Sequence, residues 1–503
     1  MQFLIEAAVP TNLAFSQTDS QSPIGSAIKP NAKARYLFDN LTNQLFVFGK
    51  EKESEEGAFR PLRFDLPPSE EPYAFTDFSH WEAPKTTNTT SSTPKTSIYS
   101  PVNPLVGKSK RVKTLKIQLG LACNYHCSYC MQASAREALK EKGSNQGKNQ
   151  ETASTSSPLL KIPTKPEVEH FFDTLADKGI ELDPHARIEL WGGEPLMYKR
   201  AVKAIIERVR KDFGDGVRIV IITNGSLIND DWVDFFLENH VFISISHDGP
   251  AFNLRDKNDP LDNPKTKKAW LRLHEGMKTW GSRLSMHVVL STQNTDIEAL
   301  RAFFSEKLAE DVDVSFEGIV TYEGATASQN DFADNLNAAV SLRDSMFKTL
   351  VEQPGAYPSL EDRVIPFMKR LIFKRSLIPS MQGRCNSISE NTLITTLKGE
   401  VLSCQNGFTH DSLIGSFMNE DLSIMTNRQF THWKLRPKCQ DCPVLGLCRG
   451  GCPKLAADAF DACCQNEFLF YFSLFEVALF RLTGFCIVDM KAVKDPSVLA
   501  SLC

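Results

Sequence analysis

Short apolar runs alternate with longer segments of helical periodicity between about residues 114 and 324. The apolar runs predict strands at 115–119, 187–191, 218–223, 241–246, 285–290 and 313–319. Apolar positions that recur every three or four residues predict helices between them, including 166–178, 198–212, 230–239, 265–280 and 297–308. This alternation predicts a parallel β/α architecture, and the pattern alone leaves open a partial barrel or an open doubly wound sheet.

The segments that flank this region follow other patterns. Residues 1–82 contain the strand-like runs 34–38 and 44–48, which predict a small β-rich N-terminal module. Residues 83–110 are crowded with Thr, Ser, Pro and Lys and predict a linker, and the polar stretch 140–157 predicts a mobile insertion. The longest apolar stretch, 468–485, is interrupted by Glu476 and Arg481 and predicts a buried helix rather than a membrane span.

Composition narrows the class of protein. The chain has 503 residues and is 42% hydrophobic, which predicts a soluble protein of roughly two to four domains. A formal net charge of −4 supplies no basic field for DNA or RNA, so we expect no nucleic-acid partner. The N-terminus lacks the basic region and long apolar core of a signal peptide, so we expect a cytoplasmic protein with reduced thiols.

Ten of the 13 cysteines fall into three groups. The first group is Cys123, Cys127 and Cys130, a C-x3-C-x2-C triplet directly after the first predicted barrel strand. Three thiolates can ligate three irons of a cubane cluster and leave the fourth iron open to a small molecule. Structural zinc, which favours paired C-x2-C knuckles, and disulfides, which need an oxidising compartment, fit this spacing less well.

The triplet, with the aromatic Tyr129 before its third cysteine, resembles the signature of the radical SAM enzymes. The resemblance implies a partial (β/α)6 TIM-type barrel with its site at the C-terminal ends of the strands. It implies a [4Fe-4S] cluster on the triplet that binds S-adenosyl-L-methionine (SAM). The motifs that end the next three strands imply SAM contacts from Gly192, Gly193, Glu194, Asn224, Ser246 and Asp248, with Arg255 as a further candidate for the SAM carboxylate. Taken singly, each is more often a turn or cap residue.

The C-terminal cysteines occur in the order Cys385, Cys404, Cys439, Cys442, Cys448, Cys452, Cys463, Cys464. This order resembles the SPASM extension, which carries two auxiliary [4Fe-4S] clusters. The resemblance implies a proximal cluster on Cys385, Cys404 and Cys452, with Gly399 at a hairpin turn. It implies a distal cluster on Cys439, Cys442, Cys448 and either Cys463 or Cys464, of which we place Cys464 in the ligand set. Two zinc knuckles are the alternative.

Two positions depart from the sulfatase-maturase branch of this family. That branch has a further cysteine a few residues before the position of Cys385, whereas residues 375–384 contain none. The proximal cluster is therefore expected to have an open iron, unless Cys486 or Cys503 reaches it. That branch also has an aspartate, proposed as the proton acceptor, directly after the second ligand. Here the residue is Gln405, which cannot act as a base at neutral pH.

The resemblance implies that the reduced cluster cleaves SAM to a 5′-deoxyadenosyl radical, which takes hydrogen from a C–H bond of the substrate. Because SPASM proteins mostly modify peptides, the leading hypothesis is a maturase that installs a C–S or C–C crosslink in a ribosomally synthesised peptide. An external donor such as flavodoxin or ferredoxin would supply the electron. The alternatives are oxidation of a Ser or Cys of a protein to formylglycine, as in sulfatase maturation, and a zinc-stabilised interaction protein without catalysis.

The expected organisation is an N-terminal module at 1–82, a linker at 83–110, a barrel at 111–325, a helical bridge at 326–380 and a SPASM domain with a C-terminal helix at 381–503. The N-terminal module could pair an extended leader peptide with a sheet edge. The sequence names no general base. His247, Glu317, Tyr322 and Glu323 lie at predicted strand ends, where each is more often structural than catalytic.

Overall fold

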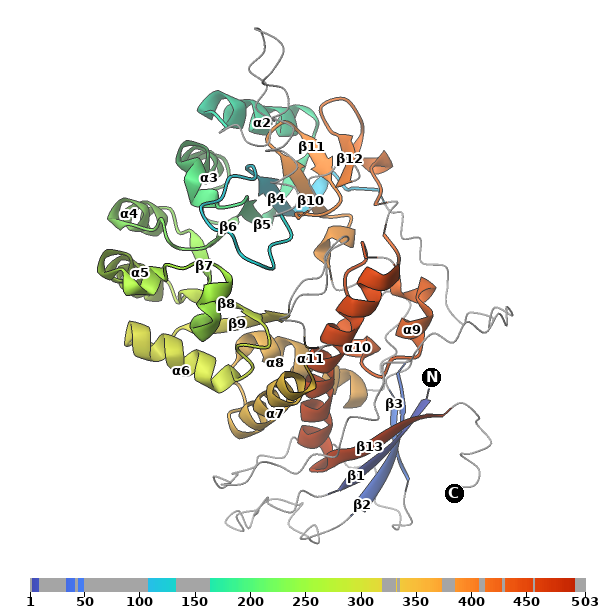
Figure 1. Cartoon of the computed structure of the whole chain (residues 1–503). Coiled ribbons are helices and arrows are strands. Elements are labelled where there is room, and N and C mark those ends of the chain that lie inside the picture. The colour runs from blue at the N-terminus through green and yellow to red at the C-terminus, as the bar shows by residue number, and fades with distance from the viewer. Residues whose placement is uncertain are drawn as a thin grey trace, which may run out of the picture.

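The computed structural model describes residues 2–8, 33–40, 44–48, 107–132, 163–318, 332, 335–372, 385–406, 412–427, 430–455 and 457–493. These residues form one nine-stranded sheet and one four-stranded sheet, with helices around and between them (Figure 1). Tyr322, Glu323, Cys503 and the expected insertion at 140–157 lie outside the described residues, as does almost all of the expected linker.

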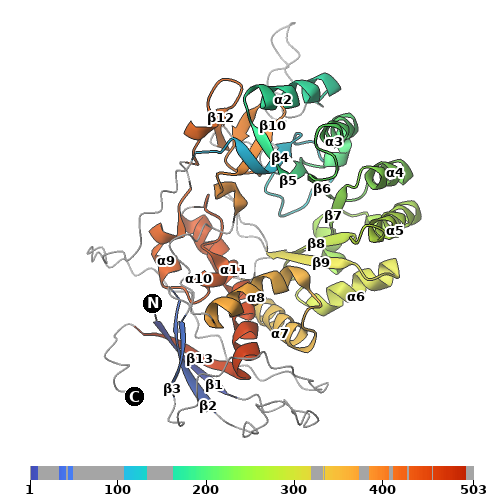
Figure 2. The ribbon, with the colours of Figure 1, turned by 180° about the vertical axis from the view of Figure 1, so that it is seen from behind.

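Six consecutive parallel strands, which extend to one edge of the larger sheet, lie where the sequence predicts them. In sheet order they are β4 (Arg111–Gln118), β5 (Glu181–Trp191), β6 (Arg218–Thr223), β7 (Phe242–Ser246), β8 (Ser285–Leu290) and β9 (Asp313–Gly318). The crossovers contain α2 (Lys165–Asp177), α3 (Lys199–Phe213), α4 (Asp230–Glu238), α5 (Pro264–Lys278) and α6 (Ile297–Leu308). Figures 1 and 2 show these helices along the outer side of a curved, open sheet. The expected α/β fold is confirmed, because parallel neighbours require such crossovers.

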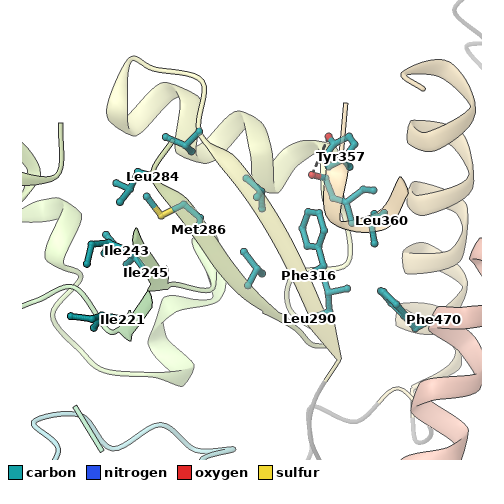
Figure 3. Packing of buried hydrophobic residues seen from close by; sticks show 14 of the residues in the cluster. Ile221, Ile243, Ile245, Leu284, Met286, Leu290, Phe316, Tyr357, Leu360 and Phe470 are labelled. Carbon is teal, nitrogen blue, oxygen red and sulfur yellow. Dashed lines mark hydrogen bonds between the residues drawn. The ribbon is translucent and has the colours of Figure 1, made fainter. Parts of the chain in front are cut away.

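Apolar side chains on the outer face of the sheet fasten the strands to the surrounding helices. On β7, Ile243 and Ile245 are 2% and 0% exposed, and Figure 3 shows them beside Met286 of β8. Phe316 of β9 packs against Tyr357, with ring centroids 5.9 Å apart. Burying such a side chain contributes roughly 1.5–3 kcal/mol. Because side chains alternate along a strand, the other face of the same strands is left for polar residues.

The C-terminal half of the chain extends the same sheet beyond β4. Strand β10 (Thr392–Thr396) pairs in parallel with β4, and β11 (Glu400–Leu402) and β12 (Leu413–Ser416) follow in antiparallel order. Gly399 forms the turn between β10 and β11 with φ +76°, a conformation that favours glycine. This confirms the hairpin predicted at Gly399, and it places the cysteines on either side of the hairpin at the edge of the barrel.

The second sheet joins the two ends of the chain. Its order is β13 (Cys486–Val493), β1 (Gln2–Ala8), β2 (Lys33–Asp39) and β3 (Gln44–Phe48), with β1 antiparallel to both of its neighbours. The sequence pattern predicted β2 and β3 but neither β1 nor β13. The N-terminal β-rich part is therefore completed by a strand from the opposite end of the chain.

Three long helices connect the two sheets. They are α7 (Leu336–Glu352), α8 (Pro358–Ile372) and α11 (Ala457–Thr483), which contains most of the apolar stretch at 468–485. Two charges in this stretch pair inside the protein: Glu476 accepts from Arg343 Nε at 2.6 Å, and Glu361 accepts from Arg481 at 2.6 Å. Of the helices that the structure describes, none has both the length and the apolar character needed to cross a bilayer.

Candidate functional site

The loop that carries the first cysteines is held against the end of β5 by backbone contacts. Gly193 donates its N–H to the carbonyl of Gly120 at 3.0 Å, and Glu194 donates to the carbonyl of Ala122 at 2.8 Å. A Cβ on Gly193 would lie 2.4 Å from the Ala122 carbonyl oxygen. Glycine at position 193 is therefore required by the close approach of two backbones, next to Cys123.

Glu194 joins the ends of two neighbouring strands. Its side chain is 1% exposed and accepts hydrogen bonds from Thr223 Oγ1 at 2.6 Å, from the Asn224 backbone N–H at 2.8 Å and from the Leu196 N–H at 3.0 Å. Burial raises the pKa of Glu194, and these three hydrogen bonds oppose the shift. The carboxylate therefore fixes the end of β6 relative to the motif after β5.

Asn224 links the end of β6 to the cysteine loop. Its amide donates to Asn124 Oδ1 at 2.9 Å, and its own Oδ1 accepts from the Ser226 hydroxyl at 2.7 Å. Asn124 in turn donates to Ser226 Oγ at 2.9 Å. This small network holds the loop between Cys123 and Cys127 in place.

Asp248 lies beneath the cysteine loop and orients Arg255. The Asp248 carboxylate is fully buried; it accepts from Arg255 Nη2 at 2.9 Å and from the Val289 N–H at 3.0 Å. It also accepts from the Tyr129 hydroxyl, and the Arg255 guanidinium lies 5.6 Å from the centre of the Tyr129 ring. Asp248 therefore acts through Arg255 and Tyr129, although the sequence predicted a direct SAM contact.

A cavity of about 400 Å³ opens beside these motifs. All three cysteines of the triplet line it, together with Gly192, Gly193, Glu194, Asn224, Ser246 and Arg255. Asp248 is not among the lining residues. Five of the six predicted SAM contacts are thus brought to one cavity, and they come from the ends of three different strands.

The three thiols of the triplet lie close enough to influence one another. The pKa of Cys127 is raised to about 12, mainly by burial. The nearby Arg255 guanidinium opposes this shift, and the Cys130 and Cys123 thiols add to it. Burial and the two neighbouring thiols therefore disfavour a free thiolate at Cys127.

The other half of the cavity is lined by a charged wall that the sequence analysis missed. Lys116 of β4 donates to Gln405 Oε1 at 2.5 Å and lies 2.9 Å from Glu189 of β5. Glu189 also accepts from Trp191 Nε1 at 3.0 Å and lies 2.7 Å from Arg187 Nε. The sequence contained a signal for this wall. Charged residues alternate with apolar ones along both strands, and this alternation places the charged side chains on the face that lines the cavity.

Two of the predicted strand-end candidates have different environments. Glu317 of β9 lines the cavity and lies 3.1 Å from His287 Nε2, whose Nδ1 is 2.9 Å from Ser315 Oγ. His247 is fully buried outside the cavity lining, where Nε2 lies 2.9 Å from Asp259 Oδ1 and Nδ1 accepts from the Gly249 N–H at 3.0 Å. His247 is therefore a structural residue, whereas His287 and Glu317 face the site.

The thiols predicted to hold the proximal cluster also interact. The pKa of Cys404 is raised to about 11, mainly by burial; the thiols of Cys385 and Cys452 add to the shift, and Lys454 opposes it. Cys486 instead pairs with Ala8 in the second sheet, at the opposite end of α11 from the cysteine arrays (Figure 1). Cys486 therefore does not complete the proximal group.

The remaining cysteines gather around two short helices, α9 (Pro437–Gln440) and α10 (Leu445–Cys448). A small pocket is lined by Cys439, Cys442, Cys448, Cys463 and Cys464. Burial raises the pKa of Cys439 to about 12, and the Cys464 thiol adds to this shift. Across the part of the chain that the structure describes, no three His, Cys, Asp or Glu side chains are grouped to hold one metal ion.

Arg436 connects the two C-terminal cysteine groups and was also missed from the sequence. Its guanidinium is buried and donates to the carbonyls of Gly450 at 2.9 Å, Cys452 at 3.0 Å and Leu455 at 2.5 Å. It stacks 3.9 Å from the centre of the Phe460 ring. Arg436 therefore fixes the loop around Cys452 and places a positive charge near thiols of both groups.

Comparisons with known proteins agree with this geometry. Residues 117–304 match the model of the Radical SAM superfamily. The serine-type anaerobic sulfatase-maturating enzyme of Bacteroides thetaiotaomicron is 23% identical over 67% of this chain and 81% of its own. The radical SAM cyclopropyl synthase TigE of Paramaledivibacter caminithermalis is 21% identical over 68% of each chain.

A solved structure shows the same fold. It is anSMEcpe with bound AdoMet, with a TM-score of 0.52 and 18% identity, covering 74% of this chain and 94% of that one. The match places the curved parallel sheet among known partial barrels. From the cysteine loop, the cavity beside it and these matches, we conclude that this chain carries a radical SAM domain.

Proposed function

We propose that this chain is a peptide maturase with three [4Fe-4S] clusters, which removes hydrogen from a ribosomally synthesised peptide and installs a C–S or C–C crosslink. Cys123, Cys127 and Cys130 would hold the SAM-binding cluster. The proximal auxiliary cluster would be held by Cys385, Cys404 and Cys452, and the distal one by Cys439, Cys442, Cys448 and Cys464. The interactions among the thiols within each group support this division.

The residues around the cavity fit SAM beside a cluster. The volume of about 400 Å³ lies within the range of roughly 300–1,000 Å³ that is typical of small-molecule sites. Gln118, at the end of β4, is 4% exposed, and among the described residues neither of its amide atoms has a hydrogen-bond partner. A Cβ on Gly192 would lie 3.8 Å from the Gln118 side-chain oxygen, so this amide borders the glycines of the cavity. A buried amide without partners is costly, which supports a bound polar group here.

When bound, SAM and the reduced cluster would supply a carbon-centred radical, chemistry that no side chain can perform. The chain's own residues would bind, orient and shield. Asp248 holds Arg255 toward the cavity, where the guanidinium can meet an anionic group. Glu194 fixes the two strand ends that surround the ligand, so its main contribution is the shape of the site.

Gln405 is the residue on which we base the choice of crosslink formation over formylglycine formation. Its side-chain oxygen accepts from Lys116 at 2.5 Å and it lines the cavity, at the position where the sulfatase-maturase branch has an aspartate. An amide cannot take a proton at neutral pH, and one lone pair of its oxygen already accepts the hydrogen bond from Lys116. This supports crosslink formation over a formylglycine reaction that uses a carboxylate at this position.

Formylglycine formation on a Ser or Cys of a protein is the second candidate. The Bacteroides relative is named for serine-type sulfatase maturation and aligns over 81% of its own length. The second relative is named for cyclopropane synthesis. Because the two names denote different reactions, relationship alone does not choose between the candidates.

The smaller sheet supports a proposal for peptide recognition. Strand β3 lies at one edge, since among the described strands it pairs only with β2. We propose that an extended leader peptide adds to this edge. Deleting residues 41–82 would remove β3 and keep β1, β2 and β13 paired. If that variant retained full turnover of the peptide, the proposal would be wrong.

The reaction is tested by anaerobic co-production of the enzyme with any short peptide encoded beside its gene, together with a flavodoxin or ferredoxin reductant. We expect a peptide that has lost two hydrogens, with a gap in its backbone fragmentation and no reaction with hydroxylamine. Formylglycine also corresponds to a loss of two hydrogens from serine, but its aldehyde is captured by hydroxylamine. Cys123→Ala should abolish deoxyadenosine formation, and persistence of deoxyadenosine in this variant would contradict the proposal.

A further inference from the structure

We propose that the charged wall of the cavity contains a carboxylate-binding subsite, in which Arg187 binds an Asp or Glu side chain of the peptide next to the reacting residue. This rests on the proposed function, because it assumes a peptide in the cavity. It goes beyond that function by naming the substrate group that the cavity selects.

Arg187 presents its guanidinium to the cavity with its terminal nitrogens available. It lies on the same face of β5 as Glu189 and Trp191, and all three line the cavity. Its side chain is 43% exposed, and its Nε lies 2.7 Å from Glu189 Oε1. Among the residues that the structure describes, the two terminal nitrogens have no hydrogen-bond or ionic partner. A guanidinium held at one end and open at the other can bind a carboxylate through two parallel hydrogen bonds.

The wall carries an excess positive charge. Lys116 and Arg187 supply two cations, and Glu189 is the carboxylate between them. Burial would raise the pKa of Glu189, but the charges of Lys116 and Arg187 hold it below its usual value, so this carboxylate stays ionised. Lys116 is already in contact with Glu189 and Gln405. The uncompensated charge is therefore exposed to the cavity at Arg187.

Arg187 is separate from the cation at the SAM end of the cavity. Arg255 lies against Asp248 and Tyr129, beside the cysteine triplet. Arg187 precedes Trp191 by four residues on β5, which corresponds to roughly 13 Å along a strand. One cation therefore lies beside the cluster loop, and the other lies further from it along β5, toward the N-terminal end of the strand.

Selection from a library of displayed random peptides tests this subsite. The immobilised, cluster-loaded protein captures the peptides under anaerobic conditions in the presence of SAM. The variants are Arg187→Gln and Arg187→Glu. The control is Arg218→Gln, because Arg218 pairs with Arg187 across β5 and β6 but lies outside the cavity lining. We expect the wild type and the control to enrich Asp or Glu at one peptide position. Arg187→Gln should lose this preference, and Arg187→Glu should enrich Lys or Arg there.

A double-mutant cycle with one enriched peptide measures how much the contact between Arg187 and the acidic residue contributes to binding. Replacing its acidic residue by the amide should weaken binding to the wild type by roughly 10- to 100-fold, the value of a charge-assisted hydrogen bond. The same replacement should change binding to Arg187→Gln by less than about twofold, since the partner is already absent. Iron content and SAM affinity should be unchanged in both Arg187 variants.

Three other results would overturn the carboxylate-binding subsite. Peptides that bind without any acidic preference would overturn the subsite and leave the peptide-modifying function standing. Failure of the wild type to enrich any peptide would overturn both. Loss of SAM affinity in Arg187→Gln, with iron content intact, would assign Arg187 to SAM and refute the subsite.

Discussion

Replacing Gly193 by alanine should release the cysteine loop from the barrel. The new Cβ would lie 2.4 Å from the Ala122 carbonyl oxygen and 2.6 Å from that of Leu121, whereas ordinary contacts begin at 3.4 Å. Both neighbours are backbone atoms, which cannot move aside by a rotamer change. The loop must therefore shift by about 1 Å, a distance at which roughly a quarter to a half of the attraction between packed atoms is lost.

The cost can be worked from the hydrogen bonds that this shift would break. Gly193 to Gly120 and Glu194 to Ala122 are the two backbone hydrogen bonds between the loop and β5 at this point, at 3.0 and 2.8 Å. Each contributes about 0.5–1.5 kcal/mol, so losing both would destabilise the native position of the loop by about 1–3 kcal/mol relative to the wild type. Cys123 directly follows Ala122, so the triplet moves with it.

Iron and sulfide analysis of the anaerobically reconstituted variant, with equilibrium SAM binding, measures the effect. We expect a loss of about four iron atoms per chain, the content of one cubane, and loss of SAM binding with little change in far-UV circular dichroism. Gly318→Ala is the matched control, because a Cβ there meets no atom within 4 Å in the part of the chain that the structure describes. Full iron content and unchanged SAM affinity in Gly193→Ala would refute the reasoning.

Three further predictions concern the rest of the chain. Arg343→Met should destabilise the protein by about 3–5 kcal/mol, because it leaves Glu476 buried without its partner. The double variant Arg343→Met/Glu476→Met should recover most of this stability in thermal unfolding. Equal losses of stability in both variants would contradict a stabilising ion pair. Burial raises the pKa of Asp344 to about 6, so the stability that this carboxyl contributes at low pH should be lost as the pH rises from about 4 through 6. Asp344→Asn should flatten the plot of unfolding free energy against pH in this range. An unchanged slope of that plot would argue against this role of Asp344. Cys464→Ala should lose about four irons per chain while Cys463→Ala keeps them, and the reverse result would exchange the two ligands.

The sequence pattern predicted the barrel strands well because each is buried on its outer face. The predicted and observed bounds coincide for the strand at 218–223 and for that at 285–290. Both consist of short apolar runs bounded by turn residues, a signal that depends only on neighbours in the chain. By contrast, β1 and β13 pair residues from opposite ends of the chain. Neither strand has a local signal that identifies its partner.

Several residues that line the cavity were predictable to the same extent. Cysteine spacing predicted the triplet, and motifs at strand ends predicted Glu194 and Asn224, because such signals are confined to a few consecutive residues. The role of Asp248 was not readable. Its carboxylate binds Arg255 and the Val289 backbone, and these contacts depend on how β7 and β8 are placed side by side.

The sequence by itself determined the alternation of strands and helices, the positions of the thiols and the replacement of an expected carboxylate by Gln405. Only the tertiary structure decided which residues meet. It placed β10 beside β4, and thereby brought Gln405 to Lys116, and it turned Arg187 toward the same cavity as the cysteine triplet. The physical reason is that propensity and spacing act over a few residues, whereas the charges and shape of a site are set by side chains that the packed sheet brings together from distant segments.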